Sequence, residues 1–176
     1  KKAAGHLRRT KYMDLWLIAV IQRSKSGSVS VDETIISQIE LGFVILLGVI
    51  DEDDETDADY LADKITHLRV FNDENKKMNL SIQDVKGSAL VISQFTLCGD
   101  IRKGRRPSFI HAASPEKGNI LYEYFIAQVE NNGVPVESGE FGAMMNVNLI
   151  NEGPVTFVLD SKQRWLCLLD SKTISL

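Results

Sequence analysis

Runs of apolar and β-branched residues alternate along the chain with short polar segments, and most of them predict strands. Two of the runs, at 15–21 and 43–50, are apolar at nearly every position, as expected of strands that are buried on both faces. Between them, the alternation at 28–31 and the run at 34–39 predict a hairpin. The remaining expected strands lie at 89–92, 136–138, 144–150 and 155–159.

Apolar residues at helical spacing predict two helices. Thr56 is expected to cap the first, with Asp59 three residues later in a near capping box. Pro115 is expected to begin the second, and Asn132-Gly133 to end it. The inner faces are expected to carry Ala58, Leu61, Ile65 and Leu68 in the first helix, and Leu121, Tyr124, Phe125 and Val129 in the second. Because strands and helices do not alternate strictly, the pattern indicates an α+β fold with a mostly antiparallel sheet.

The length of 176 residues suits a single domain. We expect that domain at 15–161, with an N-terminal extension at 1–14 and a C-terminal tail at 162–176. The formal net charge of −4 excludes a global positive field, so an RNA partner would have to be held by a local basic patch.

Cysteine and histidine positions argue against metal chemistry. Cys98 and Cys167 lie far apart in sequence, and the three histidines stand singly, so neither a disulfide scaffold nor a zinc site is expected. We expect no metal, no cofactor and a cytoplasmic, reducing setting. No apolar run is long enough to span a membrane.

Three segments hold residues that could carry chemistry. Ser93-Gln94-Phe95-Thr96 follows an apolar strand, where polar donors could hold a carbonyl oxygen or satisfy neighbouring backbone. Asn151-Glu152-Gly153-Pro154 joins two apolar runs and predicts a tight turn. The cluster Arg102, Lys103, Arg105 and Arg106 could meet phosphates or form a solvated loop. From these residues alone, both readings of each segment stay open.

The chain resembles the D-aminoacyl-tRNA deacylase family. Residues 93–97 match its SQFTL motif, and residues 151–156 match its NxGPxT motif, with similar flanks over roughly residues 17 to 161. The resemblance implies an α+β fold with a barrel-like core and two main helices packed outside, assembled as a homodimer. The chain departs from the family pattern at Asp32-Glu33, where many members have Asp-Gly.

The resemblance also implies a site shared between two subunits. Ser93, Gln94, Phe95 and Thr96 would line the catalytic pocket. Gly153 and Pro154, joined by a cis peptide bond, would enter from the partner subunit as the chiral selector. Phe141, Gly142 and Met145 would bind substrate near the 3′-terminal adenosine of aminoacyl-tRNA, and Arg102, Lys103, Arg105 and Arg106 would contact the tRNA.

The implied reaction is hydrolysis of the ester of D-aminoacyl-tRNA. Thr96 is a candidate nucleophile, but the sequence supplies no obvious base to activate it. A second route uses the 2′-OH of the terminal adenosine to orient water. Two other functions stay open: an editing deacylase for glycyl- or misacylated L-alanyl-tRNA, and a non-catalytic module that binds tRNA ends.

Overall fold

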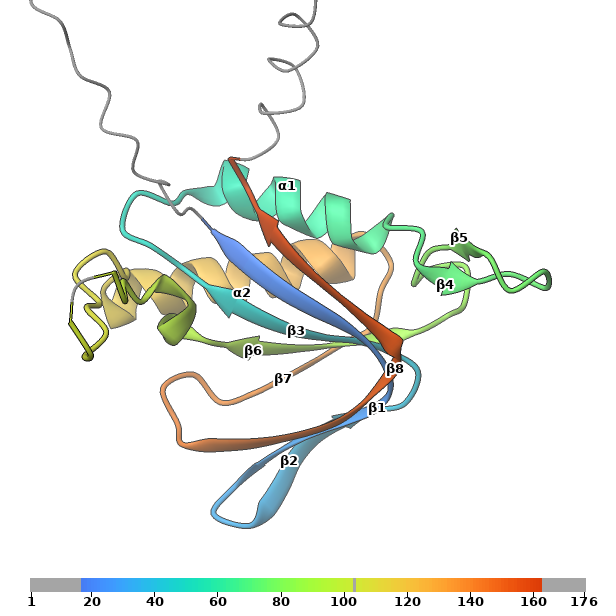
Figure 1. Cartoon of the computed structure of the whole chain (residues 1–176), viewed down its shortest axis with the longest axis horizontal. Coiled ribbons are helices and arrows are strands. Elements are labelled where there is room, and N and C mark those ends of the chain that lie inside the picture. The colour runs from blue at the N-terminus through green and yellow to red at the C-terminus, as the bar shows by residue number, and fades with distance from the viewer. Residues whose placement is uncertain (1–16, 103, 163–176) are drawn as a thin grey trace, which may run out of the picture.

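Two α-helices lie on one side of a strongly curved sheet in the computed structural model, which describes residues 17–102 and 104–162 (Figure 1). The helices are α1 (Glu55–Thr66) and α2 (Pro115–Asn131), with a short 3-10 helix, η1 (Phe95–Cys98). The strands are β1 (Ile18–Val31), β2 (Thr34–Ile39), β3 (Gly42–Gly48), β4 (Phe71–Asn72), β5 (Met78–Leu80), β6 (Ser88–Ser93), β7 (Val136–Ser138) and β8 (Met145–Asp160).

β1 organises the sheet. It pairs antiparallel with β8 along almost its whole length, and antiparallel with β3 and then β2 on its other edge. β3 pairs parallel with β6, and β6 pairs parallel with β7. The long strands bend so that β2, β7 and the first half of β8 curl away from the helices (Figure 1). This arrangement confirms the α+β class and the barrel-like core, with parallel pairing limited in the main sheet to the strands beside β6.

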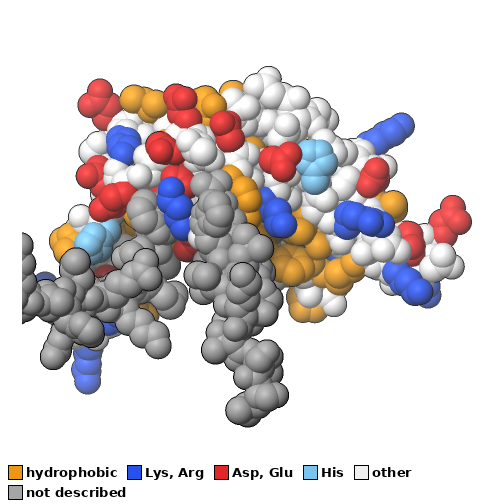
Figure 2. All heavy atoms as spheres, turned by 90° about the horizontal axis from the view of Figure 1, so that it is seen from above, with side chains coloured by type: hydrophobic (Ala, Val, Ile, Leu, Met, Phe, Trp, Pro, Cys, Tyr) orange, Lys and Arg blue, Asp and Glu red, His pale blue; other side chains and the backbone are white. Residues whose placement is uncertain are grey.

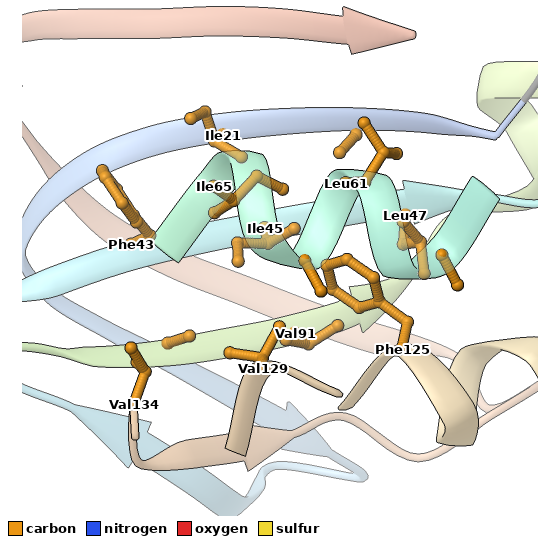
Figure 3. Packing of buried hydrophobic residues seen from close by; sticks show 14 of the residues in the cluster. Ile21, Phe43, Ile45, Leu47, Leu61, Ile65, Val91, Phe125, Val129 and Val134 are labelled. Atoms are coloured by element: carbon orange, nitrogen blue, oxygen red, sulfur yellow. The ribbon is translucent and has the colours of Figure 1, made fainter. Parts of the chain in front are cut away.

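Each face of the sheet covers its own apolar cluster. Phe43, Ile45 and Leu47 of β3 point toward α1 and α2, where they pack with Leu61 and Phe125 (Figure 3). The intervening positions point into the curl of the sheet and form a smaller cluster of Val29, Ile39, Val44, Leu90 and Ile92. Because both faces are buried, the strands are apolar at consecutive positions, which is the pattern seen in the sequence.

Two strand predictions need correction. Residues 18–21 of the first run and residues 28–31 belong to one strand, β1, whose polar middle still pairs with β8. The tight turn predicted at 151–154 is wrong, because β8 continues through these residues and bends there. The pairing register between β1 and β8 shifts at Gln22/Ser24 and Ser24/Ser26, so the polar residues mark an irregularity within a strand. The hairpin turn at Asp32-Glu33 is present, with φ of 46° and 65°.

The helix predictions are right in place but not in every detail. The N-cap of α1 is Asp54, two residues before Thr56, and its capping partner is Asp57. On α2, Tyr122 is buried although it was not expected on the inner face, and Tyr124 is half-buried against the same core while its hydroxyl donates a hydrogen bond to Asp59. The proposed extension at 1–14 and all of the proposed tail except Lys162 lie outside the described residues.

Candidate functional site

The segment Ser93–Thr96 lies where β6 ends and η1 begins. Gln94 donates its backbone N–H to Leu47 O at 2.7 Å, and its side chain donates to the Thr96 hydroxyl. Phe95 is 58% exposed and Thr96 is also exposed. The first N–H groups of a helix have no acceptor within it, so those of Phe95 and Thr96 are suited to bind an incoming oxygen atom. The segment therefore lies at the end of a strand, as its position after an apolar run predicted, with Phe95 and Thr96 at the surface.

The loop 139–145 lies beside the end of β6. Gly139 donates its N–H to Val91 O at 3.0 Å. Phe141 packs against Tyr122 with ring centroids 5.8 Å apart, and Met145 is half-buried against the inner cluster. Gly142 has φ of 79°, the left-handed region that favours glycine. The three predicted substrate-binding residues thus lie between β7 and the start of β8, in a segment that one backbone hydrogen bond ties to β6.

The basic cluster lies on a loop that leaves η1. Asp100 and Ser108 close its base with two backbone hydrogen bonds of 2.8 and 2.9 Å. Arg102 makes a two-pronged contact with Asp100, and this hydrogen bonding holds the pKa of Asp100 well below its usual range. Arg105 and Arg106 are exposed, whereas Lys103 lies outside the described residues. The loop meets η1 through Phe109, whose ring packs edge-on against Phe95 at 5.0 Å.

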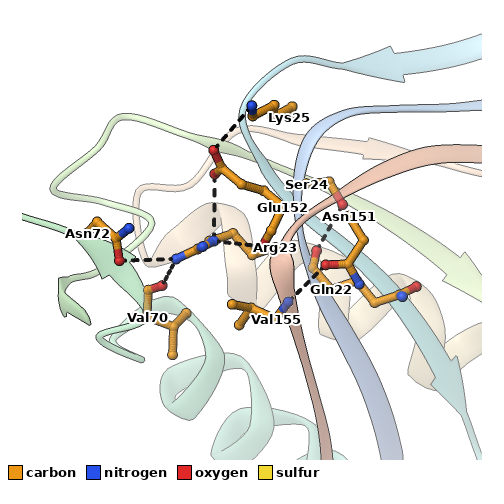
Figure 4. A network of polar contacts seen from close by, with 9 residues as sticks. All are labelled: Gln22, Arg23, Ser24, Lys25, Val70, Asn72, Asn151, Glu152 and Val155. Atoms are coloured by element: carbon orange, nitrogen blue, oxygen red, sulfur yellow. Dashed lines mark hydrogen bonds and ion pairs between the residues drawn. The ribbon is translucent and has the colours of Figure 1, made fainter. Parts of the chain in front are cut away.

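Gly153 and Pro154 lie at the bend of β8, joined by a cis peptide bond as the resemblance implied. Both are exposed. The Asn151 side chain accepts from Val155 N at 2.9 Å (Figure 4). It also donates to the Thr156 hydroxyl at 2.8 Å. The backbone of the Gly-Pro unit is therefore held from its own strand.

Arg23 supports the same bend from β1 (Figure 4). Its side chain is buried and donates to Glu152 O at 3.2 Å and to Val70 O at 2.6 Å, with a 3.6 Å ion pair to the Glu152 carboxylate. A Cβ at Gly153 would lie 2.8 Å from the Arg23 guanidinium, so a side chain there would displace one of them. Arg23 was not among the predicted site residues, because it lies in the polar middle of β1, where the sequence does not distinguish it from its neighbours.

The two motifs do not meet within one chain. In Figure 1 η1 lies at the left end of the sheet, beyond β6, whereas the bend of β8 lies at its right end. Nor does any hydrogen bond between described residues join the two segments. Within one chain, therefore, the residues of the two motifs are not brought together.

The face of the molecule on the helix side carries no surface of a single charge. Figure 2 shows acidic and basic side chains interspersed over the helix side of the molecule. Within residues 17–102 and 104–162, no group of three or more His, Cys, Asp or Glu side chains is placed to hold a metal ion. No helix in that part is both long and apolar enough to cross a membrane.

One buried carboxyl lies behind the site. Burial raises the pKa of Asp53 to about 7, against the lowering effect of hydrogen bonds from the backbone N–H groups of Ile50 and Leu17. Burial also raises the pKa of the nearby Cys98 thiol to about 11, and the charge of Asp53 adds to this. Nothing in the local sequence separated Asp53 from its acidic neighbours, because its burial depends on tertiary packing.

Sequence relatives cover nearly the whole described domain. A profile of the D-Tyr-tRNA(Tyr) deacylase family matches residues 20–160. A protein of Bacillus cytotoxicus named D-aminoacyl-tRNA deacylase is 55% identical over 143 residues, which are 81% of this chain and 98% of the relative. A Koribacter versatilis protein of the same name is 55% identical over 146 residues, covering 83% and 98%.

Solved structures share the fold of this chain. One named c-Myc DNA Unwinding Element Binding Protein superposes with a TM-score of 0.76 at 37% identity, covering 81% of this chain and 97% of that one. Another, of a probable eukaryotic D-amino acid tRNA deacylase, has a TM-score of 0.71 over 82% of this chain and 98% of that one. Its 19% identity supports the fold alone. With the family profile over most of its length and relatives at 55% identity, this chain belongs to the D-Tyr-tRNA(Tyr) deacylase family.

Proposed function

We propose that this protein hydrolyses the ester of D-aminoacyl-tRNA to free D-amino acid and tRNA. The observation that carries the proposal is that both motif segments, 93–97 and 151–156, are intact and surface-accessible in a chain 55% identical to proteins named D-aminoacyl-tRNA deacylase. An editing deacylase for glycyl- or L-alanyl-tRNA and a non-catalytic tRNA-end binding module are the competing functions, and each predicts a different outcome of the deacylation assay described below.

The proposed chemistry takes place at Ser93–Thr96. The backbone N–H groups of Phe95 and Thr96 stabilise the oxyanion that forms when water attacks the ester carbonyl. Gln94 ties this turn together, because its backbone bonds to β3 and its side chain to Thr96. The 2′-OH of the terminal adenosine orients the water. Ser93, Gln94, Phe95 and Thr96 therefore hold and polarise the ester, and none of them forms a covalent intermediate.

The proposed chirality check lies at Gly153-Pro154. Because Arg23 and Asn151 hold the backbone of this segment, it offers a firm wall that leaves no room for an L side chain. Exclusion of the wrong enantiomer gives selectivity without requiring tight attraction to the D form.

A homodimer brings the two segments together in this proposal. β8 exposes apolar side chains around the bend, with Ile150 59% and Val158 68% exposed. Exposed apolar side chains on a strand next to a functional segment favour burial against a partner. In a symmetric pair the contact is reciprocal, so each Gly153-Pro154 reaches the Ser93–Thr96 pocket of the other subunit.

The tRNA end would lie across the pocket rim. Phe141, Gly142 and Met145 provide a surface for the terminal adenosine, because unpaired bases are held by stacking and apolar contact. Arg105 and Arg106 reach toward the acceptor phosphates from the loop 100–108, with Lys103 assigned to the same role. Arg102 contributes less, because Asp100 already engages its guanidinium.

The test is deacylation of D-tyrosyl-tRNA and L-tyrosyl-tRNA by the purified protein, with glycyl-tRNA and L-alanyl-tRNA as further substrates. We expect release of D-tyrosine at least about a hundredfold faster than L-tyrosine, a ratio that steric exclusion can supply. Equal rates for the two enantiomers contradict the chirality check. Preference for L-alanyl-tRNA indicates the other editing activity, and tRNA binding without turnover indicates the non-catalytic module.

A further inference from the structure

Asp53 is a buried carboxyl with no ion-pair partner among the described residues. It is 2% exposed and lies in the connection between β3 and α1. One oxygen accepts from Leu17 N at 2.8 Å and the other from Ile50 N at 2.7 Å. Burying an ionisable group costs free energy, and two backbone N–H donors from different segments offset only part of that cost. We therefore ask what the two hydrogen bonds of the Asp53 carboxyl hold in place.

Asp53 bonds to the segment that follows β3, and residues 47–50, at the end of β3 and just after it, contact η1. Leu47 O accepts the Gln94 N–H, and Val49 O accepts from the Cys98 thiol at 3.3 Å. Gly48 allows η1 to approach closely, because a Cβ at this position would lie only 2.9 Å from Leu97 Cβ. Any shift of residues 47–50 therefore moves η1 with it.

Several other elements converge on the same stretch. The N–H of Ala113, just before α2, also donates to Val49 O, and Asp51 N donates to His111 O. Lys117 of α2 donates to Asp51 O. Among the groups around the Asp53 carboxyl, Lys117 supplies positive charge and Asp57 of α1 negative charge, while the Cys98 thiol faces it from η1. Of these side chains, the Asp53 carboxyl is the one that bonds both the end of β3 and the start of β1.

We infer that Asp53 is a positioning residue for the reaction, acting through the end of β3 on the orientation of Phe95 and Thr96. The inference rests on the proposed function, in which these two residues bind the reacting ester. It differs from a general stabilising role, since its effect is concentrated on η1.

The first test compares Asp53→Asn with Asp54→Asn. Asparagine at 53 keeps one acceptor and places an N–H₂ group against the other backbone N–H. At 54 the side chain caps α1 at the surface and touches no part of β3. We expect kcat for D-tyrosyl-tRNA to fall about tenfold in Asp53→Asn with KM within about twofold, because small misplacement of a reacting group affects turnover. Asp54→Asn keeps an N-cap acceptor on α1, because Asn caps helices about as well as Asp, and it should leave kcat within about twofold of wild type.

The second test follows η1 directly, through the rate at which a thiol reagent labels Cys98 in a Cys167→Ser background. Cys98 is 3% exposed, so labelling requires η1 to open. In Asp53→Asn we expect Cys98 to be labelled roughly tenfold faster than the rate calculated from the global unfolding equilibrium of the same variant. In Asp54→Asn it should follow global unfolding. If Asp53→Asn does not fold, Asp53→Glu replaces it, because its extra methylene displaces both acceptors.

Unchanged kcat in a folded Asp53 variant overturns the inference. So does labelling of Cys98 that follows global stability equally in both variants. If the wild-type protein hydrolyses no aminoacyl-tRNA, the proposed function fails. The labelling experiment still decides whether Asp53 controls η1, so the two failures are distinguishable.

Discussion

The hydroxyl of Thr96 accepts a hydrogen bond from Gln94, and among the described residues no histidine, lysine or carboxylate contacts it. A threonine nucleophile needs such a base. We therefore expect Thr96→Ala to keep at least about a third of wild-type kcat in single-turnover deacylation, whereas loss of a nucleophile costs several orders of magnitude. A loss of that size in Thr96→Ala, restored by Thr96→Ser, would establish the covalent route.

The complementary change is made on the RNA. A D-aminoacyl-tRNA ending in 2′-deoxyadenosine lacks the hydroxyl proposed to orient water. Slow hydrolysis of this substrate by wild type, with unchanged binding, supports the RNA-assisted route, and undiminished hydrolysis contradicts it.

Asp53 also makes stability depend on pH in an unusual direction. Its pKa is about 7 in the folded protein, against an ordinary value of 3.8, so the folded state binds the extra proton between these values. Its contribution to stability is therefore present in full below pH 3.8 and is lost as pH rises through 7. Relative to Asp53→Asn, the wild-type free energy of unfolding should fall by on the order of 2–4 kcal/mol from pH 5 to 8. Urea denaturation of both proteins measures it, and parallel pH curves would contradict the assignment.

At the residue level, sequence reading found the positions that carry recognisable motifs and missed those defined by tertiary contacts. Ser93 to Thr96 were placed correctly at a strand end, because an apolar run preceded them. Arg23 and Asp53 were not identified, since their roles depend on Glu152, Val70 and Leu17, which are distant in sequence.

The bend of β8 is the element on which the proposed chirality check depends. The Asn151 side chain makes two hydrogen bonds across it, to Val155 N and to the Thr156 hydroxyl. We expect Asn151→Ala to lower the free energy of unfolding by about 1–2 kcal/mol, because a backbone donor loses its partner. We also expect the ratio of D to L deacylation rates to decrease, since the Gly153-Pro154 backbone is held less rigidly. Urea denaturation and paired deacylation rates measure the two effects.

A matched control for this change lies on the same strand. Asn146 is exposed and makes none of the side-chain hydrogen bonds identified among the described residues. Asn146→Ala should alter stability by less than about 0.5 kcal/mol and leave chiral preference intact. Equal effects of the two substitutions would mean that the bend does not depend on Asn151.

Element prediction succeeded where hydrophobic periodicity was clean and failed where polar residues interrupted a strand. The helices and the β1–β2 hairpin were placed correctly from spacing. The polar middle of β1 and residues 151–154 of β8 lie where the register between the two strands shifts, with Ser24 opposite Asn151 and Gln22 opposite Thr156. Asn, Gly and Pro in this interval were interpreted as a turn. A long bent strand and a two-strand hairpin have similar local composition, so only the pairing partner distinguishes them.

At the scale of the whole molecule, the two motifs lie at opposite ends of the sheet (Figure 1). A composite site therefore predicts complementation between defective chains. Phe95→Pro removes the N–H at the first position of η1, where proline is sterically tolerated, and Phe95→Leu is its control that keeps the donor. Gly153→Ala disturbs the other motif, because its Cβ would lie 2.8 Å from the Arg23 guanidinium and φ is +119°.

Each variant alone should lose most activity, and a mixture allowed to exchange subunits should regain it. In a heterodimer one site combines two defects, while the other combines the intact pocket of Gly153→Ala with the intact Gly-Pro unit of Phe95→Pro. Random exchange makes about half of the dimers heterodimers, and half of their sites work, so activity should reach about a quarter of wild type. Mixing Phe95→Pro with Gln94→Ala, two changes in the same segment, leaves no intact site. If the Phe95→Pro and Gly153→Ala mixture also gains nothing after exchange, the active site does not combine motifs from two subunits, and the proposed composite site is wrong.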